Sequence, residues 1–378
     1  MHDKIDASCV FVGVFHFLLL ERNKKIQTVC AMDHSNTTVL DQFSCKPYRG
    51  DTVIIEGIKM SFYIFLMLFS ILGNSSLIFI VIKHQRMQTI TNYLIVNMAV
   101  SDILITLLAV PRQITEILLA PRRWLVGGFL GLALCKGLSF LQDVSTAVSI
   151  LSLLAIAIDR YRGIVFPLRK QIVKTKLFKS IIPSIWIVSM VLHSFYFYTF
   201  KITLEDGKKM YCSPKWAPKF DEQSSAETQY VVLLVVFIVV PLCVVTFLYS
   251  VIMVNLKRGM ARCKALPRSI TARRLQEDAK VVKHVIAILI VFITCITPIN
   301  VYAILFYFTW KVKIPCNAEN FGFAAYFIFY SNASLNPCIY FIFNDKFRQG
   351  LFHIFPWKDK KNNLRQSVKL VRFKTFSI

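Results

Sequence analysis

A few polar side chains lie inside otherwise apolar stretches of this sequence, where their chemistry requires an explanation. They are Asn74, Asp102, Asn332 and Asn336. Removing such a group from water costs on the order of several kcal/mol unless it meets a hydrogen-bond partner or an ion. We therefore expect these side chains to face one interior cluster. A simpler interpretation is that they form hydrogen bonds between helices and only hold the protein together.

Arg160 raises a similar question at the end of an apolar stretch. Its guanidinium stays protonated, so it needs an acceptor or water. Asp159 is adjacent, and Asp278 precedes another apolar stretch. The sequence contains no His and Cys set at metal-ligand spacing, no nucleophile motif and no phosphate-binding loop. These residues therefore point away from an enzyme.

The elements that must position these residues are long apolar segments. The chain has 378 residues, of which 55% are hydrophobic and 17% charged, and its mean hydropathy is +0.54. Roughly 20 apolar residues in a helix cross about 30 Å of hydrocarbon. The segments that reach this length are Val53–Ile82, Ile90–Ala120, Gly131–Ile164, Leu177–Phe200, Tyr230–Leu256, Val281–Trp310 and Phe321–Phe343. The sequence thus predicts an all-α membrane protein, a bundle of seven transmembrane helices followed by a short amphipathic helix.

The distribution of charge predicts the orientation. The net charge is +24, and Lys and Arg concentrate after the first, third and fifth segments and in the tail, whereas the opposite loops also contain acids. Because cytoplasmic loops are enriched in Lys and Arg, this favours a multi-pass plasma-membrane protein in contact with lipid rather than a nucleic-acid binder. We expect residues 1–52 to be extracellular, 53–343 to form the transmembrane domain, and 344–378 to form a cytoplasmic helix and basic tail.

The beginning of the chain leaves three alternatives open. Residues 1–31 are a signal peptide, an upstream extension ahead of a start at Met32, or part of the mature chain, because Ala7–Leu20 is apolar but flanked by basic residues on its far side. Asn36-Thr37-Thr38 is a glycosylation acceptor on the predicted outer side.

The segments also carry an ordered set of motifs. The third has Cys135 at one end and Asp159-Arg160-Tyr161 at the other. The remaining segments contain Gly73-Asn74, Asn97 to Asp102, Trp186, Pro241, Tyr249, Phe292, Cys295, Pro298, Asn332 and Asn336-Pro337-Cys338-Ile339-Tyr340, and Phe347 follows them. From about Val53 to Phe355 the chain resembles the rhodopsin-like (class A) G-protein-coupled receptors.

The resemblance implies a sodium site and an activation pathway. The sodium ion would bind Asp102 within a polar cluster that also contains Asn74, Ser149, Asn332 and Asn336. Asp278 would hold Arg160 at rest, and its release would let the sixth helix swing outward to admit a heterotrimeric G protein, with arrestin as a further partner. The other activation positions that the resemblance implies are Asp159, Tyr161, Ile150, Pro241, Tyr249, Phe292, Pro298, Pro337 and Tyr340.

The resemblance also sorts the cysteines. It implies a disulfide between Cys135 and Cys212. Cys45 and Cys316 are both expected outside, where oxidising conditions would permit a second bridge.

Two ligand classes of the family do not fit. Gln142 stands where receptors for amines carry a carboxylate, and the neighbouring Asp143 is expected to turn about 100° away along the helix. Tyr330 stands where a retinal-binding lysine would be. We therefore expect no retinal and no other cofactor besides an allosteric sodium ion.

The sequence looks most like the peptide-receptor branch, especially the neuropeptide Y and RFamide receptor groups, on account of Cys135-Lys136, Trp124 and the run Leu141 to Ser145. An extracellular peptide ligand would contact the candidate pocket residues Arg112, Gln113, Glu116, Gln142, His193, Ile296 and Tyr326. Each of these has the alternative of a purely structural role.

Two other functions stay open on the sequence. A seven-helix transporter usually shows internal repeats, and none is visible. A receptor-like partner or scaffold without its own agonist is favoured by Ile296, because the family commonly carries Trp at that position.

Overall fold

The computed structural model describes residues 51–119, 121–166, 175–205, 207, 209–263, 270–311, 315 and 318–354. The predictions for residues 1–31, Asn36, Cys45, Cys316 and the tail beyond residue 354 lie outside this part of the chain.

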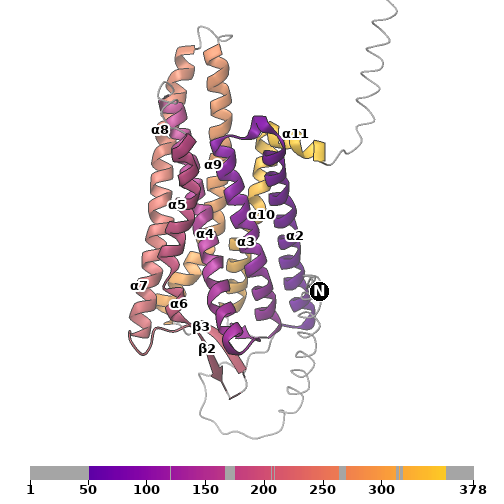
Figure 1. Cartoon of the computed structure of the whole chain (residues 1–378), viewed down its shortest axis with the longest axis vertical. Helices are drawn as coiled ribbons and strands as arrows, with labels where there is room; N and C mark the ends of the chain where they lie inside the picture. The colour runs from indigo at the N-terminus through magenta and orange to yellow at the C-terminus, as the bar shows by residue number, and fades with distance from the viewer. Residues whose placement is uncertain are drawn as a thin grey trace, which may run out of the picture.

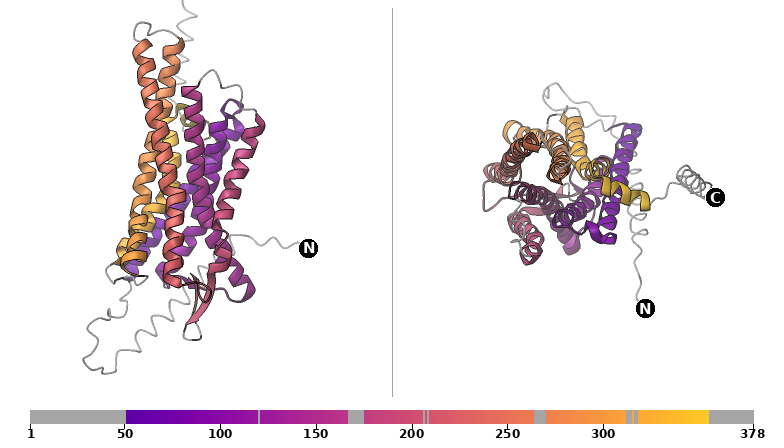
Figure 2. Two further views of the ribbon diagram at one scale, coloured as in Figure 1. Left: turned by 90° about the vertical axis from the view of Figure 1, so that its left-hand side faces the viewer. Right: turned by 90° about the horizontal axis from the view of Figure 1, so that it is seen from above.

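The described residues form a bundle of long helices (Figures 1 and 2). Their bounds are α2 (Val53–Lys83), α3 (Ile90–Leu118), α4 (Gly128–Val165), α5 (Thr175–His193), α6 (Tyr196–Thr199), α7 (Glu222–Leu234), α8 (Val240–Cys263), α9 (Ile270–Ile304), α10 (Glu319–Phe343) and α11 (Asp345–Ile354). A 3₁₀ turn, η1 (Gln85–Met87), precedes α3, and two π-helical segments continue helices: η3 (Val235–Val239) joins α7 to α8, and η4 (Leu305–Thr309) follows α9.

Six helical spans among the described residues are long and apolar enough to cross a membrane. They begin at Val53, Ile90, Gly128, Ser180, Glu222 and Asp278. Many apolar side chains on them face outward, and Phe65 is 67% exposed. Such exposure is stable where lipid replaces water. The seventh predicted helix is α10, which has 25 residues and packs against α2 and α9.

Polar residues fix where several helices begin. The side chain of Thr52 accepts a hydrogen bond from the backbone amide of Ile55 at the start of α2, and Thr89 does the same at α3. These caps satisfy amides that have no partner within the helix. The helices also run past the apolar segments, since α9 begins at Ile270 rather than Val281. Polar residues continue a helix readily once it has left the membrane.

The contact between α2 and α10 is unusually close at Gly73. A Cβ atom added there would lie 2.7 Å from Cγ of Pro337. Only glycine therefore permits this approach of the two helices. Gly350 of α11 makes a similar approach to Ile80 of α2, which places the predicted amphipathic helix against the bundle. Figure 2 shows α11 running across that end of the bundle.

A small antiparallel sheet covers the opposite end of the bundle, which is otherwise helical as predicted. Its strands are β1 (Arg123–Trp124), β2 (Phe200–Glu205) and β3 (Lys209–Pro214), in the order β1-β3-β2. The Cys135–Cys212 disulfide ties β3 to the start of α4, with Cα atoms 5.8 Å apart. This confirms the predicted bridge. We call this end the hairpin end, and the opposite end, where Figure 1 shows α11, the Arg160 end, because Arg160 lies near the last residues of α4.

Candidate functional site

A cavity of about 800 Å³ lies within the helix bundle at the hairpin end. Residues of α3, α4, α5, α7, α9 and α10 line it, and Pro214 and Trp216 reach it from the region of β3. The residues that the sequence predicted for ligand binding all line this cavity: Arg112, Gln113, Glu116, Gln142, His193, Ile296 and Tyr326. The structure thus brings together the whole predicted set.

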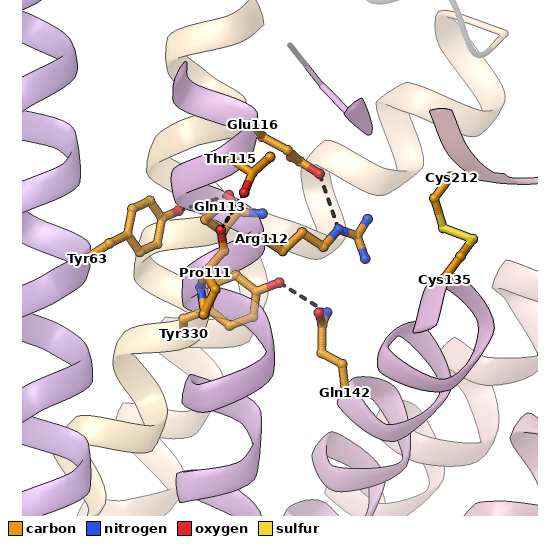
Figure 3. A network of polar contacts seen from close by, with 10 residues as sticks. All are labelled: Tyr63, Pro111, Arg112, Gln113, Thr115, Glu116, Cys135, Gln142, Cys212 and Tyr330. Carbon is orange, nitrogen blue, oxygen red and sulfur yellow. Dashed lines mark hydrogen bonds and ion pairs between the residues drawn. A yellow bond between two sulfur atoms is a disulfide. The ribbon is translucent and has the colours of Figure 1, made fainter. Parts of the chain in front are cut away.

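The wall formed by α3 holds a polar network (Figure 3). Nε of Arg112 lies 3.2 Å from Oε1 of Glu116, one helical turn away. The hydroxyl of Tyr63 donates to Oε1 of Gln113 over 3.2 Å. Both interactions fix side chains before any ligand arrives, and fixed polar groups determine the orientation of a ligand.

Across the cavity, α4 contributes two neighbouring side chains. Nε2 of Gln142 donates to the hydroxyl of Tyr330 on α10 over 3.2 Å (Figure 3). Asp143 lines the same cavity and accepts a hydrogen bond from the hydroxyl of Tyr196. The expectation that Asp143 turns away from the pocket is therefore wrong.

The reason lies in the end of the fourth membrane span. α5 ends at His193, and the single turn of α6 carries Tyr196 back against α4. The cavity extends as far as Tyr196 in this turn. Gln142 and Asp143 therefore both line the cavity, although their side chains point about 100° apart. No pattern in the sequence signalled the α6 turn, because it lies within an apolar run.

The base of the cavity is apolar. Ile150 of α4 and Ile296 of α9 line it and are each 5% exposed, and Phe292 belongs to the same hydrophobic cluster. Nδ2 of Asn300 donates to the carbonyl of Ile296 over 2.8 Å. Asn300 lies two residues after Pro298, which has no amide hydrogen to contribute to the helix.

A buried polar cluster lies deeper in the bundle. The carboxylate of Asp102 is fully buried and accepts from Oγ of Ser149 at 3.1 Å and from Nδ2 of Asn336 at 2.7 Å. Nδ2 of Asn74 instead donates to the carbonyl of Ala333 over 2.9 Å. The structure therefore confirms direct contacts among three members of the predicted cluster.

Two further members of the predicted cluster each have a buried oxygen without a hydrogen-bond partner in the described part of the chain. Oδ1 of Asn74 and Oδ1 of Asn332 have no hydrogen-bond partner among the residues that the structure describes. A buried carbonyl oxygen without a donor is costly, so these atoms suit a donor or a cation.

Arg160 contacts Asp159, one of the two acids that the sequence named for it, and also Thr91. Its Nη2 lies 2.6 Å from Oδ2 of Asp159, and it also donates to Oγ1 of Thr91, which itself donates to Asp159 over 2.6 Å. Asp278 has an interaction of its own in the structure, and its role as a latch for Arg160 stays a prediction. Sequence reasoning missed Thr91, since a threonine near the start of a helix usually signals only a cap.

The remaining activation positions lie on α4, α8, α9 and α10. Tyr249 of α8 and Tyr340 of α10 are buried, Pro241 lies in α8 just after η3, and Pro298 and Pro337 lie within α9 and α10. Tyr161 follows Arg160 and packs partly buried against the main core cluster.

Comparisons with known proteins agree with this arrangement. Residues 73–340 match the model of the 7 transmembrane receptor (rhodopsin family). The Substance-K receptor of Rattus norvegicus is 30% identical over 299 residues, which is 78% of this chain and 74% of that protein. The RYamide receptor of Drosophila melanogaster is 30% identical over 352 residues, covering 85% of this chain and 70% of its own length. The Neuropeptide FF receptor 2 of Mus musculus is 26% identical over 332 residues, with coverage of 84% and 76%.

A protein with these relatives, this disulfide and this cavity is a multi-pass membrane receptor and no enzyme. The chain belongs to the rhodopsin-like (class A) family of G-protein-coupled receptors.

Proposed function

We propose that this receptor binds an extracellular peptide and transmits that binding to a heterotrimeric G protein. The observation that carries the proposal is the cavity of about 800 Å³, which places charged groups of both signs around an apolar base. A peptide presents backbone amides, side chains and termini together, so it can satisfy many separated polar groups at once. The names of the relatives, receptors for substance K, RYamide and neuropeptide FF, also support a peptide.

Ion pairs and hydrogen bonds order the rim of the cavity. Nζ of Lys59 lies 2.6 Å from Oδ2 of Asp51 at the start of α2. Oε2 of Glu222 accepts from the backbone amides of Trp216 and Ala217, at 2.8 and 3.1 Å. A rim that is ordered before binding loses less conformational entropy when the peptide binds, so more of the contact energy contributes to affinity.

The proposal places the chain in the plasma membrane with the hairpin end outside. A disulfide such as Cys135–Cys212 persists in oxidising extracellular surroundings, which supports this orientation. Residues 1–52 would then be extracellular, and Asn36 accessible to glycosylation. The Arg160 end would face the cytoplasm, where the G protein, arrestin and the headgroups of the inner leaflet meet the basic loops.

Transmission would pass through α9. Ile296 touches the cavity, Phe292 lies one turn further toward the Arg160 end, and Pro298 provides a point of bending. A ligand that prefers the open arrangement of α9 shifts the population toward it. Opening would expose Arg160 to the G protein, with Tyr249 and Tyr340 able to approach it.

The donor set of the polar cluster fits a sodium ion. Asp102 supplies a carboxylate, Ser149 a hydroxyl, and Asn332 and Asn74 supply carbonyl oxygens without partners among the described residues. Hard cations prefer oxygen ligands of this kind. The ion would compensate the buried charge of Asp102 and favour the resting state.

The test is a screen of peptide libraries on cells that express the full chain, with reporters for each major class of G protein. An active pool whose response disappears with Arg160→Ala, at equal surface expression, supports the proposal. If no peptide pool activates any reporter, a receptor without its own agonist becomes the better description.

A further inference from the structure

The acidic residues that line the cavity outnumber the basic residues that line it. Asp51 is paired with Lys59, and Arg112 with Glu116. Arg122 lies against the ring of Phe306, with 5.8 Å from its guanidinium carbon to the ring centroid. The acids that line the cavity without an ion pair in the described part of the chain are Asp143, Glu222 and Glu319. Negative charge is thus in excess, and two of these acids lie near the rim.

We propose that Asp143, held by Tyr196, anchors a cationic side chain of the ligand, and that a guanidinium fits this subsite best. The inference rests on the proposed peptide function and names the chemistry that the peptide would bring. Asp143 is half-buried in α4, well below the rim formed by the hairpin. Its hydrogen bond comes from the neutral hydroxyl of Tyr196, which orients the carboxylate, and it has no ion pair among the residues that the structure describes.

A carboxylate in such surroundings binds a cation more strongly than one at the surface. Tyr196 is only 5% exposed, and Asp143 is itself half-buried. Coulomb attraction between opposite charges grows as the surroundings become less polar. The ligand cation would therefore supply the compensation that Tyr196 cannot.

Aromatic rings around Asp143 favour a guanidinium over an ammonium. Tyr196 and Phe200 pack with ring centroids 5.0 Å apart, and both line the cavity together with Tyr307. A guanidinium is planar, stacks on aromatic faces and donates two parallel hydrogen bonds to a carboxylate. An ammonium is more strongly hydrated and offers no flat face.

The wall formed by α3 is a less favourable place for the ligand cation, because its acid is already paired with an arginine. Glu116 of α3 is already paired with Arg112 at 3.2 Å, and Arg112 also lines the cavity (Figure 3). A second cation beside this pair would meet the positive charge of Arg112. Asp143 has no ion pair among the described residues, so a ligand cation can pair with it without displacing a cation of the protein.

The test uses the purified full-length receptor and two small probes of equal size. Nα-acetyl-arginine amide carries a guanidinium, and Nα-acetyl-citrulline amide is its neutral counterpart. Thermal unfolding is followed with a thiol-reactive dye, since Cys295 is buried in the folded protein. At a concentration about ten times its Kd, the arginine probe should raise Tm by about 2 °C or more relative to the citrulline probe.

Asp143→Asn should abolish this difference. Asp51→Asn is the matched control, because it makes the same substitution at a cavity acid that is already paired with Lys59, and the difference should persist. Tyr196→Phe removes the hydrogen bond that orients Asp143 and should weaken the arginine probe about fivefold, while its preference over the citrulline probe persists because the charge of Asp143 remains.

The inference is overturned if the two probes stabilise the native receptor equally, or if Asp143→Asn keeps the preference for arginine. Peptide pools tested with G-protein reporters address the proposed function separately. A preference for the arginine probe without any activating peptide would support the subsite and contradict the peptide function. Activating peptides whose potency is unchanged by replacing each Arg with citrulline would support the function and overturn the subsite.

Discussion

Nδ2 of Asn336 donates a hydrogen bond of 2.7 Å to Oδ2 of Asp102, joining α10 to α3. The other carboxylate oxygen accepts from Ser149 of α4 at 3.1 Å. Three helices therefore share one buried carboxylate. A change in its charge alters the hydrogen bonds that join all three helices.

Asp102→Asn should remove the dependence of the receptor on sodium. In the native protein we expect a Tm higher in sodium chloride than in choline chloride, because an ion bound only by the folded state stabilises it. The variant lacks the charge that holds the ion, so its Tm should be the same in both salts. Asp51→Asn, which changes an acid at the hairpin end, serves as the control and should keep the difference. A sodium effect that survives in Asp102→Asn would rule out this site.

Thr91→Val should raise basal nucleotide exchange. The hydroxyl of Thr91 contacts both Arg160 and Asp159, and valine has nearly the same shape without these hydrogen bonds. Losing about 1 kcal/mol from the resting arrangement shifts the population toward the open state roughly fivefold. The measurement is GTPγS binding in membranes without agonist, with Arg160→Ala as the inactive reference.

Asp278→Asn distinguishes the hydrogen bonds of Thr91 from an ion pair between Arg160 of α4 and Asp278 of α9 as the contact that stabilises the resting state. Higher basal exchange in Asp278→Asn, with no change in Thr91→Val, would show that the resting state depends on Asp278 rather than on the contacts of Thr91.

Cys135→Ser and Cys212→Ser should each reduce surface expression, and the double variant should be no worse than either one. Both cysteines are buried within one bridge between α4 and β3. Replacing either cysteine removes the disulfide. Replacing the second cysteine as well therefore causes no further loss of stability. Flow cytometry of intact cells measures the effect. Additive losses would mean that each cysteine stabilises the protein independently.

Gly73→Ala should lower the stability of the bundle. Its Cβ would lie 2.7 and 2.9 Å from the ring of Pro337, which cannot move without displacing α10. Overpacking of this kind costs about 1–3 kcal/mol and should lower Tm by several degrees. Gly57→Ala, in the same helix, is the matched control because nothing lies within 4 Å of its added Cβ. Equal Tm values for the two variants would contradict the close approach.

The polar cluster was predictable from the residues themselves, whereas the disulfide was predicted from the resemblance to the family. A carboxylate such as Asp102 inside an apolar helix must meet polar groups, and the only such groups at that depth lie on neighbouring helices. The positions of the cavity residues followed from the same pattern, because Arg112, Gln113 and Glu116 interrupt an apolar helix toward one end.

Asp143 and Thr91 were mispredicted or missed because their roles depend on tertiary geometry. Helical periodicity gives the direction of Asp143 but not the width of the cavity, which is set by where α5 ends and how α6 turns. The contacts of Thr91 depend on how closely α3 approaches α4 at the Arg160 end. The sheet at the hairpin end likewise depends on the disulfide and on strand pairing between distant loops.

Ile296 is the clearest departure from the family pattern, and its replacement tests how the cavity works. It lines the cavity base, is 5% exposed and lies in the same core cluster as Ile150 and Phe292. An aliphatic side chain here leaves more room for the ligand than the tryptophan that the family commonly has. The parts that act downstream, including Arg160 and Tyr249, are present in the structure.

Ile296→Trp should therefore weaken the agonist by filling space that the ligand uses. The overpacking penalty is on the order of 1–3 kcal/mol, which corresponds to a loss of potency of roughly five- to 150-fold. Dose–response curves of G-protein activation measure it, and Ile296→Leu, which keeps the volume, is the control and should change potency little. If Ile296→Trp instead creates a response where the native chain answers to no peptide, the small side chain interrupts transmission to Phe292. The native protein would then act as a partner receptor without an agonist of its own.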